Sequence, residues 1–440
     1  KFFLLRDLLK NYLPAGETLP AVPAALPVIE IPEFHFHKVA PLFSNLPEAK
    51  QTVDIQPMEQ FNQGWGTILY RTTLPETTLA GTTLKITEVH DWAQIYADGK
   101  LLARLDRRKG EFTTTLPALK KGIQLDILVE AMGRVNFDKS IHDRKGITEK
   151  VELISGNQTK ELKNWTVYNF PVDYSFIKDK KYSDTKILPT MPAYYKSTFT
   201  LDKVGDTFLD MSTWGKGMVW VNGHAMGRFW EIGPQQTLFM PGCWLKEGEN
   251  EILVLDLKGP TRASIKGLKK PILDVLREKA PETHRKDGEK LKLTGEKVGH
   301  EGAFTPGNGW QEVRFATPVK GRYFCLEALS PQANDNIAAI AEFDVLGADG
   351  KPVSREHWKI RYADSEETRS GNRTADKIFD LQESTFWMTV DNVPYPHQLV
   401  IDLSKVENVT GFRYLPRAEK GYPGMIKEYR VYVKPADFNY

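Results

Sequence analysis

Apolar and polar residues alternate along most of the chain from about Val53 onward, and turn-forming residues interrupt this alternation. A period of two is typical of half-buried strands, and turns at roughly eight- to twelve-residue intervals favour sandwiches or barrels. Residues 1–13 instead show helical periodicity, and prolines punctuate residues 14–47. We therefore predict an all-β protein with one short helix at its start.

Two segments repeat the same strand–turn–strand pattern. QIYADGKLLARLDR, around Asp98-Gly99, aligns with VWVNGHAMGRFW, around Asn222-Gly223. Asp-Gly and Asn-Gly favour a type I′ turn, because both central residues of that turn need positive φ. In each segment an arginine, Arg104 or Arg228, stands five residues after the turn glycine. We interpret the two segments as an internal repeat of one sandwich type.

These patterns and the linkers between them divide the chain into segments. The expected segments are a helix over 1–14, a Pro-rich linker over 15–47, a first sandwich over 48–165, a connector with a second sandwich over 166–260, a charged linker over 261–289 and a third sandwich over 290–440. A length of 440 residues fits such a number of domains.

Composition argues against several classes of protein. Lys and Arg total 59 against 57 Asp and Glu, whereas a nucleic-acid-binding protein usually has a basic excess. The longest apolar runs are strand-sized, so we expect no membrane span and no membrane partner. Cys243 and Cys325 lie in different expected domains, which argues against a disulfide or a thiolate metal site.

Several segments carry a family resemblance: KFFLLRDLLKNYLP, WAQIYADGKLLARLDRR, LVEAMGRVNF, WTVYNFPVD and, most specifically, GKGMVWVNGHAMGRFW. They resemble the region after the catalytic barrel in glycoside hydrolase family 35 β-galactosidases. The resemblance implies two jelly-roll, galactose-binding-domain-like sandwiches, and a first helix that is the remnant of a missing TIM barrel. It also implies an accessory region of an enzyme that hydrolyses terminal β-galactosides, in a periplasmic or extracellular location.

Catalysis by this chain itself is not expected. Retaining glycosidases need two carboxylates roughly 5–5.5 Å apart, and the resembled family carries both on a barrel of about 250 residues. No segment matches the motifs around those glutamates, and the adjacent pair Glu366-Glu367 would point to opposite faces of a strand. We therefore name no catalytic residue, although an unrecognised site stays an alternative.

One loop in the first sandwich has an expected role in the whole enzyme. In GRVNF, the resemblance places Phe137 over the mouth of the missing barrel, where it closes the galactose pocket, with Asn136 and Arg134 behind it. Relatives often carry tyrosine at this position, so Phe137 keeps the stacking face but loses the hydroxyl. The alternative is an aromatic residue that only fills a domain interface.

The last 150 residues resemble the discoidin, or coagulation factor 5/8 type C, module, through WKIRYADSEE, STFWMT, HQLVIDLSK, FRYLPR and MIKEYRVYVK, and through GWQEVRF, GRYFCLEALSP and AAIAEFDVLG. The second half of the module, over 290–350, precedes the first half, over 351–440. We predict one circularly permuted sandwich; two half-modules would leave sheet edges exposed. Galactose-containing glycans are the implied partner, and the candidate sugar-binding residues are Arg369, Asn372, Tyr395, His397 and Tyr422.

Many discoidin-like modules hold a structural calcium ion near this segment. The resemblance offers Asp380, Thr385 and Glu342 as ligands, but Leu381 and Gln382 replace the usual glycine and second acid. Calcium takes six to eight oxygen ligands, so the lost acid weakens the prediction. No other cofactor is expected. The alternative to glycan binding is that all three sandwiches are purely structural or serve oligomerisation.

Overall fold

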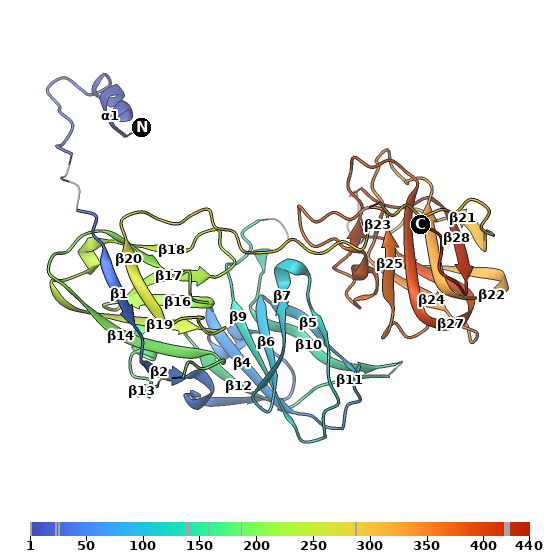
Figure 1. Cartoon of the computed structure of the whole chain (residues 1–440), viewed down its shortest axis with the longest axis horizontal. Helices are drawn as coiled ribbons and strands as arrows, with labels where there is room; N and C mark the ends of the chain where they lie inside the picture. Colours follow the sequence, from blue (N-terminus) through green and yellow to red (C-terminus); the bar gives the residue numbers. More distant parts are fainter. Residues whose placement is uncertain are drawn as a thin grey trace. The chain divides into compact units, whose positions relative to one another are not determined.

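The computed structural model describes residues 2–22, 24, 27–137, 141–156, 158–185, 187–286, 288–417 and 423–440. Strands dominate the described residues, and the α-helices there are α1 (Phe2–Lys10) and the single turn α2 (Tyr174–Ile177) (Figure 1). The all-β prediction is confirmed. Contacts divide the chain into two units, residues 1–45 with 173–278, and residues 46–172 with 279–440.

The first jelly roll consists of two antiparallel sheets. One has the order β3-β12-β4-β9-β6-β7 and the other the order β11-β10-β5-β8. The strands are β3 (Ala49–Thr52), β4 (Gly66–Thr73), β5 (Thr83–His90), β6 (Trp92–Ala97), β7 (Lys100–Asp106), β8 (Thr113–Thr115), β9 (Gln124–Ala131), β10 (Gly146–Ser155), β11 (Gln158–Glu161) and β12 (Trp165–Phe170). Their alternating apolar side chains, such as Ile68, Ile127 and Trp165, meet in one buried core.

The second jelly roll lies in the other unit. Its sheets have the orders β13-β2-β14-β19-β16-β17 and β1-β20-β15-β18. The strands are β1 (Ile31–His35), β2 (Lys38–Pro41), β13 (Ser183–Asp184), β14 (Ala193–Leu201), β15 (Thr207–Asp210), β16 (Lys216–Val221), β17 (His224–Trp230), β18 (Thr237–Met240), β19 (Gly248–Asp256) and β20 (Ser264–Leu268). Tyr195, Trp214 and Val254 are central to its core.

Three strands of this roll lie where we expected linkers. β1 and β2 fall in the proline-rich stretch 15–47, and β20 falls in 261–289. In Figure 1 the blue strand β1 runs beside the yellow strand β20, and Phe34 pairs with Ile265. Their partners are far away in sequence and the strands are short, so local alternation gave too weak a signal to separate them from a linker.

The two rolls repeat the same strand order, which confirms the internal repeat. β9-β6-β7 in the first roll corresponds to β19-β16-β17 in the second. Asp98 and Gly99 have φ of 43° and 78°, and Asn222 and Gly223 have φ of 48° and 86°, as type I′ turns require. β1 and β2 take the places that β11 and β12 hold in the first roll. The second roll is therefore a permuted copy whose sequence is interrupted by the first.

The third sandwich combines both halves of the discoidin-like segment. Its main sheet has the order β21-β28-β22-β27-β24, with β25 paired to β27, and β23 pairs with β26. The strands are β21 (His300–Ala303), β22 (Gln311–Ala328), β23 (Ala339–Ile340), β24 (Glu342–Leu346), β25 (Lys359–Ala363), β26 (Trp387–Met388), β27 (His397–Leu415) and β28 (Glu428–Lys434). Phe324, Phe343 and Phe412 pack together, so the halves form one sandwich, as expected.

Two further expectations concern crosslinks and membranes. Cys243 is exposed and Cys325 is buried, and both are free thiols. Within the described ranges, no helix has the length and apolar character needed to cross a bilayer.

Candidate functional site

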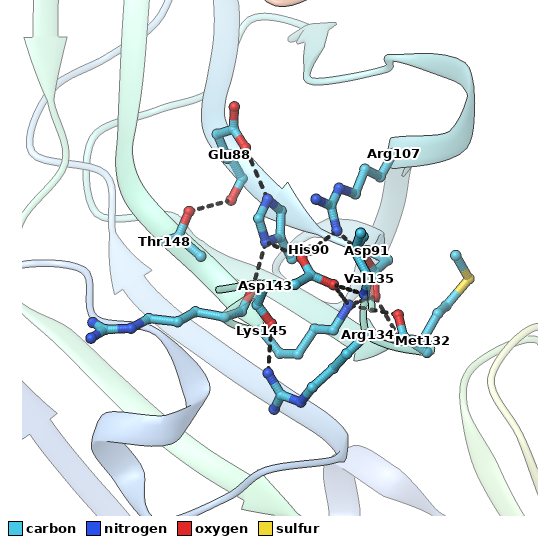
Figure 2. Close-up of polar contacts among 12 residues, drawn as sticks. Glu88, His90, Asp91, Arg107, Met132, Arg134, Val135, Asp143, Lys145 and Thr148 are labelled. Carbon is cyan, nitrogen blue, oxygen red and sulfur yellow. Dashed lines mark hydrogen bonds and ion pairs between the residues drawn. The ribbon is translucent and has the colours of Figure 1, made fainter. Parts of the chain in front are cut away.

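A buried ionic cluster lies at one end of the first jelly roll, behind the loop that joins β9 to β10 (Figure 2). Its centre is Lys145, whose side chain is 0% exposed. The Lys145 ammonium donates to Asp91 Oδ2 at 2.7 Å, to Asp143 Oδ2 at 2.7 Å and to the Gly133 carbonyl at 3.0 Å. A buried ammonium is tolerated only where its charge and donors are satisfied, as they are here.

A second cation closes the cluster. Arg107 Nη1 lies 2.8 Å from Asp91 Oδ1 and 2.7 Å from Asp143 Oδ1. Two carboxylates are thus matched by two cations. Burial alone would raise the pKa of Asp143, but hydrogen bonds from Lys145, the Val135 amide and Arg107 outweigh it and lower that pKa to about 2. The Asp143 carboxylate is therefore ionised at neutral pH.

The same groups hold the loop in place. Asp91 Oδ2 accepts the Met132 amide at 2.7 Å, and Asp143 Oδ2 accepts the Val135 amide at 3.0 Å. Arg134 donates to the Asp143 carbonyl at 2.5 Å and to Glu59 Oε1 at 2.6 Å. These bonds tie down both the backbone and a side chain within residues 132–135.

The loop tip is exposed. The side chain of Phe137 is 81% exposed, and Asn136 is exposed as well. The structure therefore places Phe137, Asn136 and Arg134 on one anchored loop, with the aromatic ring presented to the outside and the arginine serving as an anchor. An exposed aromatic that follows anchored residues is suited to cover the apolar face of a sugar or of a partner domain.

Sequence analysis missed the anchoring residues. Asp91, Asp143 and Lys145 stand directly beside strands of strong apolar alternation, where charged residues are normally solvated. One signal for the anchoring residues was available: charged residues stand directly beside buried strands, as Lys145 does before Gly146, the first residue of β10. Only the folded structure shows that these charges point inward.

Two of the candidate sugar-binding residues of the third sandwich, Tyr395 and His397, lie together, with ring centroids 4.6 Å apart. His397 is 0% exposed, and its ring nitrogens pair with Asp364 Oδ2 at 2.8 Å and the Asn336 carbonyl at 2.7 Å. Tyr395 is half-buried and donates to the Ile337 carbonyl at 2.6 Å. Both residues thus hold a loop in place. The burial of His397 contradicts its expected contact with sugar, and the Tyr395 hydroxyl proton is already donated to the Ile337 carbonyl.

The remaining candidates differ in accessibility. Arg369 is exposed, and Asn372 is half-buried with its Oδ1 accepting the Thr374 hydroxyl at 2.7 Å. Tyr422 lies outside the described residues. Trp310, which the sequence analysis named only within the GWQEVRF motif, is 36% exposed, and its Nε1 donates to Glu383 Oε1 at 3.3 Å. The guanidinium of Arg413 lies 4.6 Å from the ring centroid, so the indole is fixed while part of it faces solvent.

The three candidate calcium ligands do lie together. The Gln382 amide donates to Glu342 Oε1 at 2.7 Å and to Asp380 Oδ1 at 3.1 Å, and the Thr385 hydroxyl donates to Asp380 Oδ2 at 2.8 Å. Burial raises the pKa of Glu342 to about 7 and, with repulsion from Glu342, that of Asp380 to about 8. A nearby cation favours the ionised form of such buried acids, and Arg355 forms an ion pair with Glu342. Among the described residues no group of three or more His, Cys, Asp or Glu is placed to hold a metal.

Together these features define a protein of tandem β-sandwich modules that present loops and anchored aromatics. Family models match three parts of it: the first all-beta domain of beta-galactosidase over residues 56–171, the galactose-binding domain of beta-galactosidase over 192–250, and the F5/8 type C domain over 362–440.

The sequences of individual relatives agree with these family models. Beta-galactosidase of Xanthomonas manihotis is 33% identical over 241 residues, 54% of this chain and 38% of the relative. Beta-galactosidase 1 of Dictyostelium discoideum is 30% identical over 292 residues, 58% and 42% respectively. Beta-galactosidase of Bos taurus is 32% identical over 331 residues, 65% and 47% respectively. The chain thus spans about two fifths of the length of these relatives.

These matches confirm the resemblance to the all-β, non-barrel region of the glycoside hydrolase family 35 β-galactosidases, together with an F5/8 type C module. Likeness to solved structures adds nothing to this assignment. A Streptomyces avermitilis α-L-rhamnosidase complexed with L-rhamnose matches with a TM-score of 0.19 and 10% identity over 91% of this chain and 46% of its own.

Proposed function

We propose that this chain is the accessory region of a β-galactosidase that hydrolyses terminal β-galactosides: it braces the catalytic barrel and completes its galactose pocket, but does not itself cleave the substrate. The observation that carries this proposal is the anchored loop, which holds Phe137 81% exposed on a buried ionic support. Burying the three charged groups Asp91, Asp143 and Lys145 behind an exposed tip is expected where the tip contacts a ligand or a partner.

A second surface supports the missing barrel as partner. None of the residues of α1 is buried, and Phe3, Leu4 and Leu8 are 66%, 75% and 51% exposed. An amphipathic helix normally buries its apolar face against another element. The last helix of a TIM barrel would do so against the barrel strands.

Hydrolysis by the chain alone is not part of the proposal. The acids that gather are buried and already hydrogen-bonded: Asp91 is 2% and Asp143 is 4% exposed, and Glu342 is 2% exposed. A glycosidic bond cannot lie between such groups, as a two-carboxylate mechanism demands. Assay of the purified chain with a chromogenic β-galactoside should give only the background rate; turnover above background would refute this part.

The pocket role is tested in the full parent enzyme. Phe137→Ala should raise KM for a β-galactoside by about fivefold or more, since a stacking face contributes roughly 1 kcal/mol or more. The matched control is Phe239→Ala, an aromatic that is 50% exposed on β18 of the second roll and should leave KM unchanged. Equal KM values for the Phe137 variant and the wild type would show that the loop only fills an interface.

We also propose that the F5/8 type C module binds galactose-containing glycans weakly, so that it raises the local substrate concentration. Its support is the module type together with the fixed, partly exposed indole of Trp310 and the exposed Arg369. Titration of the chain with lactose should quench Trp fluorescence in the wild type, less in Trp310→Ala, and normally in Lys351→Ala. A flat wild-type titration would favour purely structural sandwiches. By family resemblance, we place the parent enzyme in the periplasm or outside the cell.

A further inference from the structure

The acidic pair of the third sandwich is matched by side-chain cations of the same module. We infer that Arg355 and Lys377 stand in for the divalent cation that related modules bind beside Glu342 and Asp380, so that this module keeps its fold without a metal ion. The inference concerns the stability of the module and is independent of the proposed glycan binding.

The first argument is the occupation of the carboxylate oxygens. Glu342 Oε1 accepts the Gln382 amide at 2.7 Å, and Glu342 Oε2 pairs with the Arg355 guanidinium. Asp380 accepts the Thr385 hydroxyl at 2.8 Å and 2.9 Å, and the Lys377 ammonium lies 3.7 Å from Asp380 Oδ2. Each carboxylate oxygen therefore already faces a donor or a cation.

The Gln382 amide adds a specific obstacle to a metal. Its N–H points at Glu342 Oε1 and Asp380 Oδ1 together. A calcium ion bridging these carboxylates would need the same region, and the positive end of an N–H dipole repels it. Calcium also needs six to eight oxygens, whereas the position of the missing second acid is held by this glutamine, whose Nε2 is buried without a partner.

The second argument is charge balance. A third buried acid, Asp344, lies on the same strand as Glu342; Arg355 Nη2 lies 2.6 Å from its Oδ1, and Arg413 Nε donates to its Oδ2 at 2.9 Å. Three acidic side chains thus face the three cations Arg355, Arg413 and Lys377. Adding a divalent cation beside these three cations would increase the positive charge of a largely buried group.

The third argument is the backbone at Leu381. Its φ is +65°, a left-handed conformation that costs a residue with a side chain more than it costs glycine. This is the position where the motif of related modules has glycine. The turn has therefore kept the conformation that brings the next amide to both carboxylates, although the glycine and the second acid are gone. The cations supply the attraction that holds the strained turn.

The test compares calcium binding and unfolding in the full 440-residue chain. Calcium binding to the wild type is measured by isothermal titration up to 5 mM CaCl2, and thermal unfolding is followed by Trp fluorescence in EDTA and in CaCl2. The variant Lys377→Gln/Leu381→Gly/Gln382→Asp removes one cation and restores the motif. Lys377→Gln alone tests the cation, and Lys351→Gln, an exposed lysine of the same module, is its control.

We expect no calcium heat for the wild type and Tm values in EDTA and CaCl2 that agree within about 1 °C. Lys377→Gln should lower Tm in EDTA by about 4 °C or more, and Lys351→Gln by less than about 1 °C. The triple variant should bind calcium and gain Tm on adding it. The inference is overturned if the wild type binds calcium with a Kd below about 0.1 mM and gains Tm, or if Lys377→Gln is as stable as Lys351→Gln. Both tests hold even if the triple variant does not fold.

Discussion

The two jelly rolls have the same strand order, but the partners that stabilise a buried carboxylate differ between them. In the first roll, Asp91 lies on the loop before β6, accepts the Met132 amide beyond β9, and is neutralised by Lys145 and Arg107. In the second roll, Asp256 lies at the end of β19 and accepts the amides of Gly215, Lys216, Lys258 and Gly259. In both rolls a carboxylate connects the segment before β6 or β16 to the loop after β9 or β19. The carboxylate belongs to the first of these segments in the first roll and to the end of β19 in the second roll.

This difference follows from the loop that each roll carries. The loop after β9 spans residues 132–145, whereas the corresponding loop after β19 spans only 257–263. A short loop is held by the amides of one carboxylate, because its own backbone surrounds the acid. A longer loop with an exposed tip needs anchors that reach further, and Lys145 and Arg107 provide them. The comparison teaches that the ionic cluster is an addition to a shared frame, made where a loop has to be presented.

The largest expected effect comes from removing the central cation. Lys145→Met leaves Asp91 and Asp143 buried with one cation, which should destabilise the first roll by about 3–5 kcal/mol. Hydrogen exchange measured by mass spectrometry should become faster in β9 and β10, while β19 and β20 are unchanged. Lys150→Met, which removes a lysine that is 45% exposed, should change neither.

In the second roll the matching substitution is Asp256→Asn. An amide nitrogen would face one of the four backbone donors, so one or more N–H groups lose their acceptor, at an expected cost of about 2 kcal/mol. Exchange should then accelerate in β16 and β19 and not in the first roll. Asp202→Asn, at an exposed site, is the control; acceleration in both rolls would contradict their independence.

Lowering the pH should affect the stability of the two rolls differently. The pKa of Asp143 is lowered to about 2 in the folded state, so its contribution is present above an unfolded pKa near 4 and lost as pH falls toward 2. This amounts to about 2 kcal/mol. Burial raises the pKa of Asp256 despite its four amides, so protonation favours the folded second roll as pH falls. Exchange in β10 should therefore rise between pH 4 and pH 2 before exchange in β19 does.

The hairpin turns should respond equally in the two rolls. Gly99 has φ +78°, and a Cβ there would contact nothing within 4 Å, so Gly99→Ala probes the backbone alone. Gly223 has φ +86° and only ordinary contact with the Tyr174 ring at 3.5 Å. Each alanine should cost about 1 kcal/mol, measured as faster exchange in its own hairpin. A much larger effect in one roll would show that its turn has a further role.

The smallest effect is expected at the loop tip. Phe137→Ala removes a ring that is 81% exposed, so the stability of the first roll should change by less than about 0.5 kcal/mol. Unchanged exchange in β9 and β10, together with the raised KM in the parent enzyme, would show that the Phe137 ring serves the galactose pocket and does not stabilise the loop. Faster exchange would show that the ring packs on its own roll.

The sequence by itself determined the sandwich class and the two type I′ hairpins, because alternation and Asp-Gly or Asn-Gly turns are local signals. Only the tertiary structure decided that residues 31–41 complete the second roll, that His397 is a core residue, and that Lys145 and Asp143 point inward. These depend on which distant strands pair and on whether a charge finds its partner across the fold, and neither is encoded in the neighbouring residues.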